Sequence, residues 1–156
     1  MSQRVSCWGI AEVSTVSYPN SIRAYAGERP PMAKVLVIDD EPYARVLLDI
    51  HLRRQGYDVL LADDGWKGLQ LYHQEHPDVI LLDLDMPELD GVTVLKEIRA
   101  VDFKQPVIVL TGNNNPETEQ QVRAIGVNEF VLKSSSMHFL ENTLTHLFMS
   151  RKPKFG

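Results

Sequence analysis

The stretch Asp78-Val-Ile-Leu-Leu-Asp-Leu-Asp-Met-Pro87 joins an unbroken apolar run to a carboxylate and then to a turn. A run of this kind is typical of a strand in a parallel sheet that helices cover on both faces. Asp83 follows the run at the predicted end of the strand. Because α/β proteins bind their ligands outside the carboxyl ends of such strands, Asp83 is a candidate functional residue.

Three other apolar runs end in polar residues in the same way. The run Val35–Ile38 leads into the acidic pair Asp39-Asp40. Thr111 and Lys133 end two later runs. Parallel strands bring their carboxyl ends to one edge of the sheet, so four predicted strands direct polar groups toward the same place.

Strand-like and helix-like segments alternate five times from Lys34 onward. The pattern predicts strands near residues 34–39, 57–61, 78–83, 106–111 and 127–131. It predicts helices near residues 42–55, 65–75, 91–100, 116–125 and 136–149. Start signals accompany these helices: Pro42, Asp63 or Asp64, Asp90, Asn115 with Pro116, and Ser135 or Ser136. Strict alternation predicts an α/β fold, a doubly wound five-stranded parallel sheet with five helices.

The last predicted helix has apolar residues at helical spacing. They are Phe139, Leu140, Leu144, Leu147 and Phe148. A stripe of this kind predicts a face that packs on the sheet, so we expect all five side chains to belong to the core.

Length and composition indicate one globular domain. The chain has 156 residues, of which 44% are hydrophobic and 24% charged, which suffices for one core but hardly for two. The net charge is −5, and residues 1–31 contribute three Arg against two Glu, so the remaining residues carry −6. An acidic domain is a poor ligand for nucleic acid, so no nucleic-acid partner is expected.

Cysteine content and hydropathy bear on metal chemistry and location. The single cysteine, Cys7, excludes an intramolecular disulfide framework, and no paired Cys/His spacing predicts a thiolate zinc site. No apolar run reaches the roughly 18 residues of a membrane span, and the N-terminus lacks the roughly 7 apolar residues of a secretory signal. We therefore expect a cytoplasmic protein with no membrane insertion.

Residues 1–31 differ in composition from the rest of the chain. They are rich in Ser, contain the pair Pro30-Pro31 and show no sustained period, which predicts an irregular N-terminal extension. An alternative is that Met32 is the natural start, because it leads directly into the first predicted strand. The expected organisation is an extension at 1–31, a globular domain at 32–150 and a short basic tail at 151–156. A domain that stands alone, without an output domain, is expected.

The acidic residues at the predicted edge indicate metal and phosphate chemistry. Carboxylates held close together repel one another, so they either keep protons or recruit a cation. Hard oxygen ligands with no His or Cys nearby select Mg²⁺ or a similar ion, which commonly bridges carboxylates to a phosphoryl group. Lys133 can neutralise one phosphoryl oxygen and Thr111 can donate a hydrogen bond to another. Asp83 is best placed to attack phosphorus.

Five segments of the chain carry a resemblance to a known family: Val35-Leu-Val-Ile-Asp-Asp-Glu-Pro42, Gly56-Tyr-Asp-Val59 with Ala62-Asp-Asp-Gly65, Pro77-Asp-Val-Ile-Leu-Leu-Asp-Leu-Asp-Met-Pro-Glu-Leu-Asp-Gly91, Leu110-Thr-Gly112, and Gly126-Val-Asn-Glu-Phe-Val-Leu-Lys133. With these segments, residues 33–149 resemble the receiver domain of two-component response regulators. The resemblance implies a flavodoxin-like receiver fold. It also implies a signalling phosphoacceptor rather than an enzyme, one that assists its own phosphorylation and dephosphorylation.

The resemblance implies a role for each residue at the acidic edge. Asp83 is the phosphoacceptor. Asp40 and Asp83 bind Mg²⁺ directly, together with the backbone carbonyl of Asp85, and Asp39 acts through a metal-bound water. Lys133 contacts the phosphoryl group.

The resemblance also implies a switch and partners. Thr111 and Phe130 match the switch pair, in which the hydroxyl moves to the phosphoryl group and the aromatic ring moves inward. The phosphoryl donor is a phosphohistidine on a sensor histidine kinase or a histidine phosphotransfer protein. Output passes through contacts with a downstream protein target, and phosphorylation can lead to a homodimer.

Three residues depart from the usual pattern of the family. Ser134 stands where Pro usually follows the lysine through a cis bond, and a cis bond before a non-proline residue costs about 3 to 4 kcal/mol, so a trans bond is expected. Asp85 stands where many members have an uncharged side chain, and we hypothesise that it tunes the lifetime of the phosphoryl group. Phe130 lacks the hydroxyl of the commoner Tyr, but rotation of the ring does not need it.

Two other interpretations remain open. Asp83-Leu-Asp85 after an apolar strand also resembles the nucleophile and acid pair of haloacid-dehalogenase-type phosphatases. That family has its further acidic ligands downstream, whereas the pair Asp39-Asp40 lies upstream here. The second alternative is a receiver-like binding module that is never phosphorylated, for which the departures at Ser134 and Asp85 argue.

Overall fold

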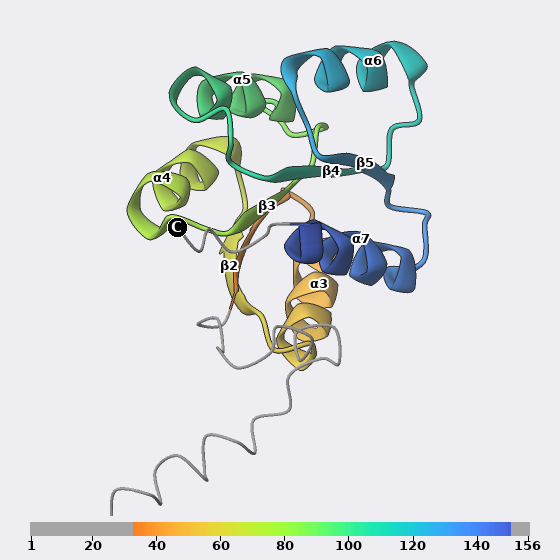
Figure 1. Ribbon diagram of the computed structural model, residues 1–156. Coiled ribbons are helices and arrows are strands. Elements are labelled where there is room, and N and C mark those ends of the chain that lie inside the picture. Colours follow the sequence, from red (N-terminus) through yellow and green to blue (C-terminus); the bar gives the residue numbers. More distant parts are fainter. Residues whose placement is uncertain (1–32, 151–156) are drawn as a thin grey trace, which may run out of the picture. The chain divides into compact units, whose positions relative to one another are not determined.

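Five strands form one parallel sheet in the order β2-β1-β3-β4-β5 in the computed structural model, which describes residues 33–150 (Figure 1). The strands are β1 Lys34–Ile38, β2 Asp58–Ala62, β3 Val79–Leu82, β4 Val107–Thr111 and β5 Glu129–Leu132. The helices are α3 Pro42–Arg54, α4 Gly65–Glu75, α5 Gly91–Val101, α6 Pro116–Ile125 and α7 Met137–Ser150. The α/β fold predicted from the sequence is confirmed, and each predicted boundary lies within two residues of the observed one.

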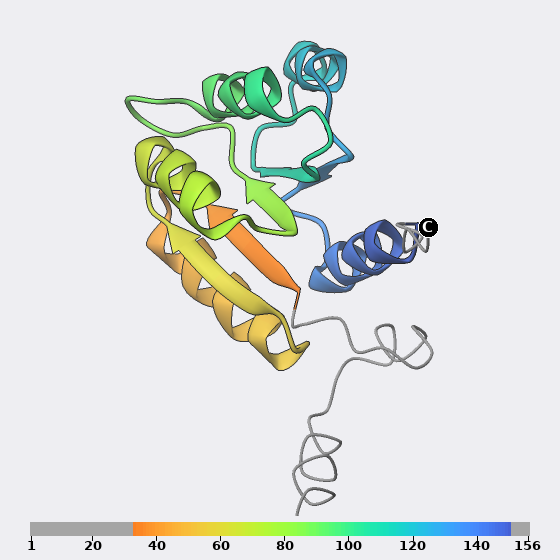
Figure 2. The same cartoon turned by 60° about the vertical axis from the view of Figure 1, so that its left-hand side comes forward.

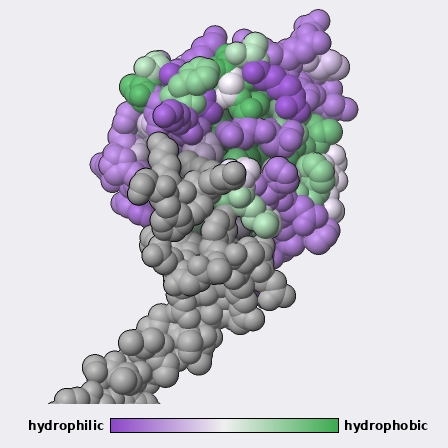
Figure 3. Space-filling model, viewed as in Figure 1, coloured by the Kyte–Doolittle hydropathy of each residue, from purple (hydrophilic) through white to green (hydrophobic). Residues whose placement is uncertain are grey.

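The predicted extension at 1–31 and the predicted tail at 151–156 lie outside the described residues and stay predictions. Between residues 33 and 150, no helix has both the length and the apolar character needed to cross a membrane. On the face seen in Figure 1, hydrophilic residues cover most of the described surface, with hydrophobic patches between them (Figure 3).

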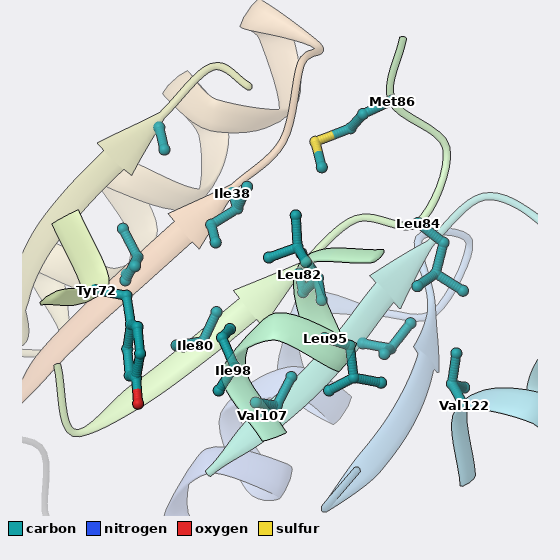
Figure 4. Close-up of a cluster of buried hydrophobic side chains, with 14 residues drawn as sticks. Ile38, Tyr72, Ile80, Leu82, Leu84, Met86, Leu95, Ile98, Val107 and Val122 are labelled. Atoms are coloured by element: carbon teal, nitrogen blue, oxygen red, sulfur yellow. The ribbon is translucent and has the colours of Figure 1, made fainter. Parts of the chain in front are cut away.

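Helices cover the sheet on both faces. Helices α3 and α7 lie on one face, and α4, α5 and α6 lie on the other (Figures 1 and 2). Alternate residues of the central strands, such as Ile80 and Leu82, pack against Leu95 and Ile98 of α5 (Figure 4). The other residues of β3 point to the opposite face, so all four are buried. This double burial is the physical reason for the unbroken apolar run of β3.

Side-chain caps explain where four helices begin. Asp64 accepts a hydrogen bond from the backbone N–H of Lys67 at 2.7 Å, so Asp64 and not Asp63 caps α4. Asp90 caps α5 and Asn115 caps α6 in the same manner. The Ser136 hydroxyl accepts from the N–H of Phe139 at 3.2 Å at the start of α7. These caps satisfy backbone donors that have no partner within the helix.

Helix α7 corrects one prediction. Leu140 and Leu144 are buried, and the ring of Phe148 stacks on Tyr57 with centroids 5.8 Å apart. Phe139, however, is 48% exposed, so its predicted place in the core is wrong. Each residue of an α-helix is turned by about 100° from the previous one, so with Leu140 facing the sheet Phe139 faces outward. Leu147 is only half-buried because it lines a cavity of about 440 Å³ next to β4 and β5.

Candidate functional site

Asp39 and Asp83 follow neighbouring strands at the carboxyl edge of the sheet. Strands β1 and β3 pair in parallel with Ile38 opposite Leu82, so the next residue of each strand lies beside its counterpart. The backbone N–H of Asp83 donates to the carbonyl of Ile38 at 2.9 Å and extends this pairing. Asp39 is 2% exposed and Asp83 is 4% exposed. Carboxylates are rarely buried to this degree without a partner, so the pair needs compensating charge.

Asp39, Asp40 and Asp83 form the acidic cluster. Each contributes one carboxylate oxygen, and these three oxygens lie within 4.8 Å of one another. Between residues 33 and 150, this is the one set of acidic, His or Cys side chains close enough to hold a metal ion. Three carboxylate oxygens without an imidazole or thiolate match the ligand preference of Mg²⁺. The donor set therefore fits the cation that the sequence predicts.

Lys133 supplies the positive charge of this edge. Its ammonium nitrogen Nζ lies 2.8 Å from Oδ2 of Asp39, 3.3 Å from Oδ2 of Asp83 and 3.4 Å from Oε2 of Glu41. The backbone N–H of Lys133 donates to the carbonyl of Thr111 at 2.8 Å, which continues the pairing of β4 with β5 and fixes the lysine at the edge. The Lys133–Ser134 peptide bond is trans, as the absence of proline predicts.

The charges at this edge change two pKa values. Burial raises the pKa of Asp83, the charge of Asp39 raises it further, and contacts with Lys133 and the N–H of Asp85 partly offset this, which leaves a pKa of about 6. Burial alone lowers the pKa of Lys133, but its hydrogen bond to Asp39 and the charge of Asp83 outweigh burial and raise it to about 12. Lys133 is therefore a permanent cation at neutral pH, whereas Asp83 takes up a proton when the pH falls through about 6.

The turn that follows Asp83 folds tightly against its own strand. A Cβ at Gly91 would lie 2.1 Å from the carbonyl oxygen of Asp83 and 2.6 Å from Cα of Leu84. The N–H of Gly91 donates to the carbonyl of Leu84 at 3.0 Å. Only glycine permits this approach, which brings the start of α5 against the backbone of Asp83 and Leu84.

Thr111 ends β4 and is completely buried. Its hydroxyl Oγ1 donates to Oδ2 of Asp85 at 3.5 Å and accepts from the backbone N–H of Asn113 at 3.3 Å. Asp85 is exposed, and its own N–H donates to Oδ1 of Asp83 at 3.4 Å. The predicted hydroxyl therefore lies at the acidic edge, joined to Asp83 through one residue.

Phe130 occupies a different position from the other predicted site residues. It lies in the middle of β5, opposite Val109 of β4. Its ring is partly buried and packs on the core between the sheet and α4, α5 and α6. The ring of Phe130 therefore does not contact the carboxylates. The paired strands β4 and β5 connect Phe130 to the acidic edge.

Two contacts of the site have no counterpart in the sequence-based predictions. Nη1 of Arg45, in the first turn of α3, donates to the backbone carbonyl of Asp39 at 2.7 Å. Glu41 contacts Lys133, and its backbone N–H donates to Oδ1 of Asp39 at 2.9 Å. Glu41 was visible as a third acid beside the pair at 39 and 40. Arg45 has no signal in the sequence, because a side chain that binds a backbone carbonyl needs no particular partner residue.

Comparison with known proteins gives one family and several longer relatives. Residues 35–145 match the family described as "Response regulator receiver domain". The chain is 42% identical over 108 residues to the "Probable transcriptional regulator ycf27" of Guillardia theta, which covers 69% of this chain and 42% of that protein. It is 36% identical over 103 residues to the "Alkaline phosphatase synthesis transcriptional regulatory protein PhoP" of Bacillus subtilis, covering 66% of this chain and 43% of that protein. The chain spans less than half the length of these curated relatives.

Solved structures share the arrangement of strands and helices. The chemotaxis protein CheY4 of Vibrio cholerae superposes with a TM-score of 0.70 at 31% identity, covering 74% of this chain and 98% of that one. A CheY-like receiver domain protein of Methanospirillum hungatei superposes with a TM-score of 0.74 at 19% identity, covering 77% of this chain and 96% of that one. The second likeness concerns the fold alone.

Proposed function

The chain belongs to the response regulator receiver domain family, and from that premise we propose that Asp83 accepts a phosphoryl group from a phosphohistidine with Mg²⁺ bound at the acidic cluster. The proposal rests on the position of Asp83, which is buried beside two further carboxylates and 3.3 Å from the ammonium group of Lys133. Receiver domains are signalling phosphoacceptors and not enzymes that turn over external substrates. The family assignment therefore argues against the phosphatase alternative.

In the proposed reaction, a carboxylate oxygen of Asp83 attacks the phosphorus of the phosphohistidine in line. An oxygen–phosphorus bond forms on Asp83 while the nitrogen–phosphorus bond of the donor breaks, and the imidazole leaves with the electron pair and takes a proton from solvent. Asp40 and Asp83, with Asp39 acting through a metal-bound water, would hold Mg²⁺, which would supply charge neutralisation at the phosphoryl oxygens. Lys133, protonated because its pKa is about 12, balances the charge that Asp83 then carries. The backbone carbonyl of Asp85 as a further Mg²⁺ ligand stays a prediction.

The signal is proposed to leave the site through β4 and β5. The hydroxyl of Thr111 would turn to the new phosphoryl group, and the ring of Phe130 would move inward, which shifts the population between two packings of the same surface. A downstream target protein would read this change. Phosphorylation-dependent dimerisation and the cytoplasmic location stay predictions from the sequence.

Helix α3 offers a surface for the protein that carries the phosphohistidine. Four of its apolar side chains are between 49% and 79% exposed, and they follow one another at helical spacing: Tyr43, Val46, Leu47 and Ile50. The helix begins two residues after Asp40, so this stripe starts beside the acidic cluster. An exposed apolar stripe next to a reactive carboxylate is suited to an apolar helical face of the donor. Replacing Leu47 by Ser should slow transfer from a protein donor about tenfold and leave the rate with acetyl phosphate unchanged, because a tenfold change corresponds to about 1.4 kcal/mol, a cost typical of truncating one well-packed interface side chain. Equal slowing with both donors would contradict the assignment.

The first test of the proposed function is intact-mass analysis after incubation with acetyl phosphate and Mg²⁺. The wild type is compared with Asp83→Asn and with Asp78→Asn, a matched control at the other end of the same strand. Asn at position 78 can still accept the hydrogen bond that Asp78 takes from the N–H of Lys34, so the control should fold.

Three outcomes decide the matter. A gain of one phosphoryl group in the wild type and Asp78→Asn, but not in Asp83→Asn, supports the proposal. A gain in Asp83→Asn as well would mean that a residue other than Asp83 accepts the phosphoryl group. No gain in the wild type, with the fold intact and Mg²⁺ bound, would favour the binding-only module.

A further inference from the structure

The proton of the Thr111 hydroxyl already has an acceptor when no phosphoryl group is present. The hydroxyl donates to Oδ2 of Asp85 and accepts from the N–H of Asn113. A hydroxyl has one proton to donate. While this proton is shared with Asp85, it is not available to an oxygen of a phosphoryl group on Asp83.

The carboxylate of Asp85 depends on Thr111 for its hydrogen bond. In the part of the chain that the structure describes, Asp85 makes no ion pair, and its side chain takes a side-chain hydrogen bond only from Thr111. Lys133 lies against Asp39 and Asp83 instead. Asp85 nevertheless stays close to the reacting group, because its N–H donates to Oδ1 of Asp83 at 3.4 Å.

We propose that Asp85 is a positioning residue that holds the hydroxyl of Thr111 in the resting state and competes with the phosphoryl group for it. This inference rests on the proposed function of Asp83. Phosphorylation replaces the single negative charge of the Asp83 carboxylate by up to two charges on the phosphoryl group, so repulsion between this group and Asp85 favours departure of Asp85 while the hydroxyl turns to a phosphoryl oxygen. The long donor–acceptor distance of 3.5 Å makes this a weak restraint, which suits a bond that must be exchanged.

Asp85 should therefore slow the phosphorylation of Asp83. Removing the Asp85 side chain leaves its backbone carbonyl and N–H in place and frees the hydroxyl of Thr111. Asp85→Ala should therefore raise the rate of phosphorylation by acetyl phosphate at saturating Mg²⁺. Loss of a negative charge near the site would also raise this rate, so the single variant does not separate the two causes.

A double-mutant cycle separates them. Asp85→Ala is made in the wild type, in Thr111→Val, which keeps the shape but has no hydroxyl, and in Thr111→Ser, which keeps the hydroxyl. If Asp85 acts through the hydroxyl, the acceleration caused by Asp85→Ala should be about threefold or more larger in the wild type than in the Thr111→Val background. In the Thr111→Ser background, Asp85→Ala should accelerate phosphorylation as much as in the wild type. Equal acceleration in all three backgrounds would overturn the inference and leave only a general effect of charge.

A second measurement uses the unphosphorylated protein. In protein with ¹³C-labelled threonine methyl groups, Asp85→Ala should shift the resonance of the Thr111 methyl group, while Asp64→Ala, which removes a distant carboxylate, should not. An unchanged Thr111 resonance would overturn the inference. If the wild type gains no phosphoryl group, both the proposed function and the role of Asp85 are wrong. If the wild type is phosphorylated but the effects of the Asp85 and Thr111 substitutions are additive, only the role of Asp85 is wrong.

Discussion

Polar side chains have different kinds of partners at the two edges of the sheet. At the amino edge, three polar side chains each have a hydrogen-bond partner in the backbone. Asp78 accepts from the N–H of Lys34 at 2.7 Å, Asn128 accepts from the N–H of Val107 at 2.9 Å, and the buried Gln105 donates to the carbonyl of Pro77 at 3.1 Å. At the carboxyl edge, Asp39 and Asp83 are buried and share the ammonium group of Lys133 with Glu41, which is exposed.

The difference separates polar side chains whose partners the fold supplies from carboxylates that share too few cations. Hydrogen bonds to the backbone satisfy Asp78, Gln105 and Asn128 at the amino edge. Carboxylates that outnumber the available cations destabilise a structure, as the raised pKa of Asp83 indicates. An excess of carboxylates over cations is characteristic of functional sites, because a bound cation can compensate the negative charge.

The largest expected effect comes from removing the lysine of each edge. Lys133→Met would leave the buried carboxylates without their cation, and we expect it to lower the free energy of unfolding by about 3 kcal/mol in metal-free buffer at pH 8. Lys34→Met removes a partly exposed pair with Glu75, whose atoms are 3.3 Å apart, and should cost about 1 kcal/mol or less. Urea denaturation of both variants measures the difference. Equal losses would mean that the two edges do not differ in electrostatic strain.

A smaller effect of opposite sign is expected at Asp83. Its pKa of about 6 in the folded protein exceeds the ordinary value of 3.8, so folding favours the protonated form. The ionised carboxylate therefore lowers stability fully above pH 6, less as the pH falls through 6, and not at all below about pH 4. Asp83→Asn should stabilise the metal-free protein by about 2 kcal/mol at pH 8 and by nothing near pH 4.

The control for that measurement is Asp78→Asn at the amino edge. This variant replaces a carboxylate that already has a donor, so it should give no gain at either pH. Denaturation midpoints at three pH values decide the matter. A gain for Asp83→Asn that does not change between pH 8 and pH 4 would show that charge is not its cause.

The sequence predicted the sheet well because the decisive signals are local. Unbroken apolar runs identify buried parallel strands, and caps such as Asp64 and Asn115 act within three residues of their own position. The convergence of Asp39, Asp83 and Lys133 was predicted for a related reason. All strands of a parallel sheet end at the same edge, so the topology brings the residues that follow β1, β3 and β5 to that edge.

What the sequence did not predict depends on the approach of separate elements. The bond from Arg45 to the carbonyl of Asp39 and the bond from Thr111 to Asp85 each depend on angles and distances that no pattern records. Phe139 lies next to buried Leu140 and is nevertheless exposed, because successive residues of a helix are turned by about 100° from one another. His76 adopts a positive φ of 48° at the end of α4, where glycine would be the expected residue.

The smallest effect concerns Mg²⁺ itself. At a concentration ten times its dissociation constant, Mg²⁺ should raise the free energy of unfolding by about 1.4 kcal/mol, because it binds the folded protein alone. Protons compete for Asp83, so the increase should be larger at pH 8 than at pH 5, on the two sides of the pKa of about 6. Asp83→Asn should reduce the increase, and Asp78→Asn should leave it intact. An equal response of both variants to Mg²⁺ would mean that the ion does not bind at the carboxyl edge, and the contrast between the two edges would then need another ligand to explain it.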